Sequence, residues 1–151
     1  MAQRFQFIPP GDEITNGKNW KHLLDNIQQK EFDPFYNTTP ATEGFSDVDS
    51  YWGYYFLFGP ICFFSVTLIP TGGNAVTWTA GAAILLPYAA SYRGPTYLLE
   101  EAKSFPATNP GHTGTVADWF VLAPTSILAD NGHGAHGGNE KMQVSGWYFR
   151  E

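Results

Sequence analysis

Hydrophobic and polar positions alternate, or gather in short apolar runs, along most of the chain after residue 50. The longest run, residues 51–69, has no charged side chain and is divided by Gly59-Pro60. A type II′ turn takes a glycine with positive φ first and accepts the φ of proline second. This pair therefore predicts a hairpin in which residues 51–58 and 61–69 form two antiparallel strands.

The same run is long enough to suggest a membrane-spanning helix. Gly53, Gly59 and Pro60 interrupt it, however, and aromatic and β-branched residues dominate its remaining positions. These residue types favour a strand over a helix. We therefore expect no membrane span and no membrane partner.

Further short segments of strand-forming residues are bounded by Gly, Pro, Asn or Asp. They lie at residues 75–79, 82–86, 91–98, 116–123, 125–129 and 142–149. Residues 98–103 could form a short helical turn, and residues 105–115 are expected to form a long loop rich in Pro and Gly. Seven or eight short strands at this spacing predict an all-β domain over residues 32–151, a jelly-roll-like antiparallel β-sandwich.

The first 31 residues have a different pattern and are expected to form a separate segment. Its first part is an apolar, extended arm followed by two prolines, and its second part is one short amphipathic helix with apolar residues at i, i+3, i+4 and i+7. The arm contains Phe5, Phe7 and Ile8, and the helix contains Trp20, Leu23, Leu24 and Ile27. This segment either folds back over an open end of the sandwich or docks on a neighbouring subunit.

Charge is scarce and unevenly distributed along the chain. Only 15% of the 151 residues are charged, and the net charge is −6, which argues against binding to nucleic acid through its phosphates. Between residues 50 and 99 the only charged side chain is Arg93. This middle third is therefore expected to be buried in a core or covered by a partner.

One glycine-rich loop gathers residue types that bind metals. Asp130, His133 and His136 are spaced three residues apart, but four glycines surround them and no second shell of residues can be identified. A solvated surface loop is the favoured interpretation, so we expect neither a metal site nor a cofactor. The single Cys62 lies in an apolar run and is expected to be a small buried thiol.

Catalytic patterns are equally scarce. The sequence contains no Gly-x-Ser-x-Gly elbow. Two acids such as Asp118 and Asp49 could in principle face each other across a groove, but nothing in the sequence pairs them. Aspartate and glutamate side chains usually lie on the protein surface, and we expect the same of these. The sequence therefore predicts a protein that is not an enzyme.

Aromatic residues are abundant and fall in the expected strands. Most tryptophans are expected to pack in the core, but neighbours such as Trp147 and Tyr148 must point to opposite faces of a strand. Some aromatic surface therefore faces outward, and outward apolar surface on a charge-poor chain usually indicates a partner.

A succession of short motifs resembles the small β-sandwich domains of tailed-bacteriophage virion proteins. These domains occur in capsid decoration (cement) proteins and at the tips of tail fibres. The resemblance covers residues 32–151 and rests on Phe32-Asp33-Pro34-Phe35, residues 53–60, residues 61–69, Val76-Thr77-Trp78 and Ile84-Leu85-Leu86-Pro87. Members of the family usually carry Gly-Asn at the turn where this chain has Gly59-Pro60.

The resemblance implies a homotrimeric structural protein, assembled in the host cytoplasm and placed on the capsid exterior. As a decoration protein it would stabilise the phage head by binding neighbouring major capsid subunits. The residues expected to bind the capsid are Phe5, Phe7, Ile8, Trp20, Leu23, Leu24 and Ile27. The alternative is a tail-fibre or receptor-binding tip domain that recognises a host surface glycan through outward aromatic residues.

Overall fold

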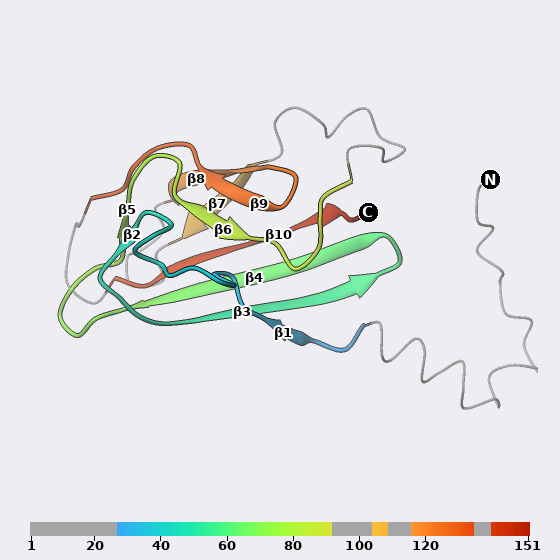
Figure 1. Ribbon diagram of the computed structural model, residues 1–151, viewed down its shortest axis with the longest axis horizontal. Helices are drawn as coiled ribbons and strands as arrows, with labels where there is room; N and C mark the ends of the chain where they lie inside the picture. Colours follow the sequence, from blue (N-terminus) through green and yellow to red (C-terminus); the bar gives the residue numbers. More distant parts are fainter. Residues whose placement is uncertain (1–26, 92–103, 109–115, 135–139) are drawn as a thin grey trace, which may run out of the picture.

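The computed structural model describes residues 27–91, 104–108, 116–134 and 140–151 (Figure 1). Nearly all regular structure in these residues is β-strand, and every recorded strand pair is antiparallel. The expected all-β class is therefore confirmed. The extended arm and nearly all of the predicted helix lie outside the described residues.

The strands form one eight-stranded sheet and one two-stranded sheet. In chain order the ten strands are β1 (Lys30–Phe32), β2 (Phe45–Ser46), β3 (Val48–Phe58), β4 (Ile61–Pro70), β5 (Thr77–Trp78), β6 (Ala83–Leu85), β7 (Ser104–Thr108), β8 (Val116–Leu122), β9 (Ser126–Ala129) and β10 (Met142–Phe149). The large sheet has the order β1-β3-β4-β10-β7-β8-β9-β6, and β2 pairs with β5.

The β3–β4 hairpin is the longest feature of the sheet (Figure 1). Phe58 pairs with Ile61, so the turn consists of Gly59 and Pro60, and Gly59 has the positive φ of 56° that the sequence predicted. Buried and half-buried residues alternate without a break along β4. The hairpin prediction is confirmed, and β10 has the predicted bounds.

Three strands were not predicted: β1, β2 and β7. Residues 105–115 were expected to form a loop, yet Ser104–Thr108 pairs with both β8 and β10 in spite of Pro106. The recorded pairing with β10 involves Ala107 and Thr108, so Pro106, which has no amide proton, pairs only on its β8 side. The strand expected at residues 91–98 and the helical turn expected at residues 98–103 fall almost wholly outside the described residues.

The large sheet curls around a single aromatic and aliphatic core. Phe45 from β2 stacks on Phe120 from β8 with ring centroids 6.3 Å apart, and both rings are buried. The two ends of the sheet also approach each other, because the amide of Leu85, the last residue of β6, donates a 3.0 Å hydrogen bond to the carbonyl of Pro34, two residues after β1. The core therefore lies inside a sheet whose outer surfaces face away from it.

Candidate binding face

Several exposed aromatic side chains lie on the outer side of the sheet over β1, β3, β4 and β10, which we call the outer face. Side chains alternate between the two sides of a strand. On β4, Phe64 and Val66 point into the core, whereas Phe63, Ser65 and Thr67 are half-buried and point outward. The same alternation on β3 and β10 places Tyr54 and Trp147 on the outer face.

Strand register arranges these outward side chains in rows across the sheet. The first row is Phe56, Phe63 and Trp147; the second is Glu31, Tyr54, Ser65 and Ser145; the third is Trp52, Thr67 and Gln143. Neighbouring strands lie about 4.8 Å apart, so members of a row are direct neighbours. Hydroxyl groups therefore run beside a row of aromatic rings.

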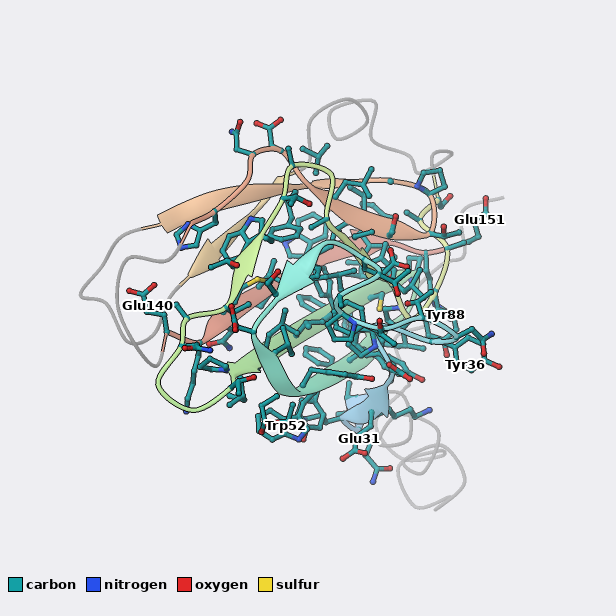
Figure 2. The ribbon with its side chains drawn as sticks, turned by 60° about the vertical axis from the view of Figure 1, so that its left-hand side comes forward. Glu31, Tyr36, Trp52, Tyr88, Glu140 and Glu151 are labelled. Atoms are coloured by element: carbon teal, nitrogen blue, oxygen red, sulfur yellow. The ribbon has the colours of Figure 1, made fainter. Side chains whose placement is uncertain are left out.

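Aromatic rings dominate the first row and remain open to solvent. Phe56 and Phe63 stack with ring centroids 4.6 Å apart and planes inclined by only 4°. Trp147 is 37% exposed and meets Phe149 edge-on at 5.9 Å. Trp52, in the third row, is 47% exposed, and Figure 2 shows it projecting from the same side of the sheet as Glu31.

Two hollows indent the outer face. The larger has a volume of about 490 Å³, and its lining includes Tyr54, Phe63, Ser65, Ser145 and Trp147. The smaller, of about 390 Å³, lies toward β1 and includes Glu31, Asp33 and Trp52 in its lining. Tyr54 lines both hollows.

The physical origin of the larger hollow is a difference in side-chain length. Ser65 and Ser145 are short and lie directly beside the large rings of Phe63 and Trp147 on the same strands. The Gln143 amide nitrogen donates to Ser65 Oγ at 3.5 Å, which ties the second row to the third. The result is a shallow trough with a hydroxyl floor and an aromatic wall.

Charge is nearly absent from this surface. Of the ten side chains in the three rows, only Glu31 is charged, and it lies at the β1 edge. Asp33 borders the smaller hollow, where its Oδ1 accepts a 2.9 Å hydrogen bond from the Phe35 amide. Among the residues that the structure describes, none of those lining the larger hollow is ionic, so this lining suits an uncharged ligand.

The tryptophans whose side chains the structure describes differ in their exposure to solvent. Trp147 is exposed and the adjacent Tyr148 is fully buried, so the expected alternation is confirmed. Trp78 packs in the core, as expected for most tryptophans, whereas Trp52 is exposed. The sequence did not identify the row of Tyr54, Ser65 and Ser145, because only the register of β3, β4 and β10 brings these residues together.

The residues predicted to bind a capsid are almost all outside the described residues. Only Ile27 is described, and it is 42% exposed. It precedes β1, whose residues 30–32 pair with β3 across the expected boundary between residues 31 and 32. The roles of Phe5, Phe7, Ile8, Trp20, Leu23 and Leu24 stay predictions.

The histidine loop differs from the solvated loop that the sequence suggested. His133 is only 9% exposed, stacks on Trp78 at 4.4 Å, and exchanges backbone hydrogen bonds with it at 2.7 and 3.1 Å. Its imidazole therefore packs as an aromatic ring against the core. Among the residues that the structure describes, no group of three potential metal ligands converges, and His136 lies outside them.

A cluster of tyrosines lies on the inner side of the same strands. Tyr148 is fully buried, and burial is the main cause that raises the pKa of its hydroxyl. Tyr55 contacts the Tyr88 hydroxyl at 3.4 Å, and this hydrogen bond, helped by burial, raises the pKa of Tyr55 to about 12. Burial likewise raises the pKa of the Cys62 thiol, which confirms the expected buried cysteine. All three groups favour their neutral forms.

No protein family, curated protein or solved structure matches this chain. Within the described ranges, no helix has the length and apolar character needed to cross a bilayer. The geometry of the outer face is therefore the main guide to what the protein does.

Proposed function

We propose that this chain is a structural protein of a tailed-phage virion, namely a capsid decoration (cement) protein. In this proposal it assembles in the host cytoplasm as a homotrimer and binds neighbouring major capsid subunits on the exterior of the head. It has no catalytic role and needs no cofactor. Its curled sheet corresponds to a jelly-roll-like sandwich.

The observation that carries the proposal is apolar exposure on a part of the sheet that is separate from the outer face. This part is an aliphatic strip formed by Ala83, Val121 and Leu128, which pair across β6, β8 and β9. Val121 is 36% exposed and Leu128 is 38% exposed. The strip lies on the β6–β9 side of the molecule, away from β3 (Figure 1).

Exposed apolar surface of this kind usually marks a contact with another molecule. A decoration protein needs contacts of two sorts, with its own copies and with the shell. We assign the aliphatic strip to contacts within the trimer, and the first 31 residues, including Ile27, to the shell. This assignment leaves the outer face free on the assembled particle.

Native mass spectrometry of the full chain at micromolar concentration tests the trimer. Leu128→Lys is expected to give monomers, because it places a charge in the aliphatic strip. Phe58→Lys is the matched control, since Phe58 is exposed at the far end of β3, and it should leave the trimer intact. A natural chain that is monomeric under these conditions contradicts the proposal.

Binding to purified heads that lack their decoration protein tests the capsid role. A chain without residues 1–26 keeps Ile27 and β1. It should remain trimeric but should no longer bind the heads. Retained binding by this shortened chain counts against the predicted capsid-binding residues. Failure of the full chain to bind any head contradicts the decoration role itself.

A second candidate function is a tail-fibre or receptor-binding tip domain. It is favoured by one observation, the combination of aromatic rings and hydroxyl groups on the outer face. Immunogold labelling of intact virions separates the two candidates, because a decoration protein labels the head and a tip domain labels the tail fibres.

A further inference from the structure

We propose that the larger hollow of the outer face is a binding site for a neutral glycan, an oligosaccharide of uncharged hexose or N-acetylhexosamine units. The inference goes beyond the decoration role and holds equally for a tip domain. It depends on the side chains around Tyr54, Ser65, Ser145 and Trp147, and not on the aliphatic strip or on the first 26 residues.

The size and composition of the hollow fit a small ligand. Its volume of about 490 Å³ lies within the range of about 300–1,000 Å³ typical of ligand pockets. Such pockets combine aromatic walls with a few polar groups that orient the ligand. Here Phe56, Phe63 and Trp147 supply the rings.

The polar side chains that line the hollow in the described part of the chain are neutral, and each can donate or accept a hydrogen bond. Tyr54, Ser65 and Ser145 carry hydroxyls, and Gln29 adds an amide beside the first row. The faces of pyranose rings are apolar and their edges carry hydroxyls. A sugar can therefore lie against Trp147 or Phe63 while its hydroxyls bond to Ser65 and Ser145.

The charge of the lining favours an uncharged sugar over a charged one. Among the described residues that line the larger hollow, an anionic sugar would find no cationic side chain and a cationic sugar would find no carboxylate. Bringing a charged group into a site without a partner is costly. A neutral glycan avoids that cost.

The hydroxyl row also argues against a flat apolar protein surface as the occupant. A second copy docking through apolar side chains would cover Tyr54, Ser65 and Ser145 and separate them from water. A buried hydroxyl that loses its water partner without replacement is costly, and of these three only Ser65 keeps a recorded side-chain partner, Gln143. A sugar replaces the lost water with its own hydroxyls, so it suits this mixed surface better.

The test uses the purified full chain and an array of neutral, sialylated and amino-sugar oligosaccharides. Hits are then measured by titration calorimetry with the same free oligosaccharide. We expect binding to neutral members of the array. No binding to any of them at millimolar concentration, or binding to charged members only, overturns the inference.

Two tryptophan variants provide a matched comparison on the same face. Trp147→Ala removes a ring that lines the larger hollow, and it should weaken binding about tenfold or more. Trp52→Ala removes an exposed ring that does not line it, and it should leave the affinity within about twofold. Equal losses in the two variants overturn the assignment of this hollow.

A third variant tests the hollow without removing an aromatic ring, whose loss could weaken binding by disturbing the fold. Ser145→Val keeps the strand and the rings but replaces a hydroxyl on the floor with a methyl group and adds a second methyl group, and it should also weaken binding. Urea denaturation of each variant shows whether its fold is retained. Because head binding is measured separately, a chain that binds heads but no glycan contradicts only the glycan site.

Discussion

The hydroxyl of Tyr148 joins the last strand to the backbone of Tyr88 through two hydrogen bonds. It donates to the Tyr88 carbonyl at 2.8 Å and accepts from the Tyr88 amide at 3.2 Å. The Ser91 amide extends the same connection by donating to the Phe149 carbonyl at 2.7 Å. One buried side chain of β10 therefore holds the segment that follows β6 against the sheet.

Removing this hydroxyl should destabilise the protein without changing its packing volume. Tyr148→Phe leaves the Tyr88 amide and carbonyl without their side-chain partner, and we expect the free energy of unfolding to fall by about 1–3 kcal/mol. Urea denaturation followed by circular dichroism measures the change. Tyr36→Phe, at a position that is 66% exposed, is the control and should have no measurable effect. Equal stability of the two variants would show that the Tyr148 hydrogen bonds contribute nothing.

Stability should decline at alkaline pH because of the inner tyrosines. The folded-state pKa of Tyr55 is raised to about 12 from an ordinary value of 10.0, and that of Tyr148 is also raised. Such groups stabilise the fold fully below pH 10, and this contribution is lost as the pH rises through the folded pKa. Between pH 10 and 12 the free energy of unfolding is therefore expected to fall.

Urea midpoints measured at intervals from pH 8 to pH 11.5 check this dependence. Tyr55→Phe should show a smaller alkaline decline than the natural chain, whereas Tyr36→Phe should show the same decline. A Tyr55→Phe variant with an unchanged pH profile would contradict the role of Tyr55.

Gly53 is required by the close approach of β1 to β3. A Cβ atom at this position would lie 2.6 Å from the Phe32 carbonyl oxygen and 2.8 Å from the Phe32 ring. Backbone cannot yield as a flexible side chain can, so Gly53→Ala should displace β1 and cost about 1–3 kcal/mol. Gly72→Ala is the matched control, because nothing lies within 4 Å of its added Cβ. A thermal melt of both variants tests the difference, and similar melting temperatures would refute it.

Cys62 should be almost inert in the folded protein. Its side chain has no exposed surface, and burial raises the pKa of its thiol, so the reactive thiolate is rare. We expect Ellman's reagent to modify it about 10³-fold or more slowly in the folded chain than in concentrated guanidinium chloride. Rapid modification of the folded chain would show that this part of the core opens easily.

The features that could be predicted from the sequence are those that local chemistry determines. Gly59-Pro60 specifies the hairpin turn, and the aromatic and β-branched residues that follow it indicate the strand at residues 61–69. Consecutive aromatic residues at 147–149 indicated that some rings must face outward. Each of these inferences needs only neighbours along the chain.

The remaining features depend on contacts between distant segments. The pairing of Trp147 with Phe63 is set by the register of β10 against β4, which no local pattern encodes. His133 looked like part of a flexible glycine-rich loop because its partner, Trp78, lies in another strand. Pro106 argued against a strand, and only the limited pairing of β7 with β10 shows how it is tolerated.

The close approach of the two ends of the large sheet affects how readily copies of the protein can aggregate by strand addition. β1 and β6 are three residues each, and the hydrogen bond from Leu85 to Pro34 draws the chain at one end to the other. Long unpaired strands invite amyloid-like growth by strand addition, and short ones that are drawn together offer little template for it. At high local concentration, copies of this protein are therefore expected to resist fusing into fibrils.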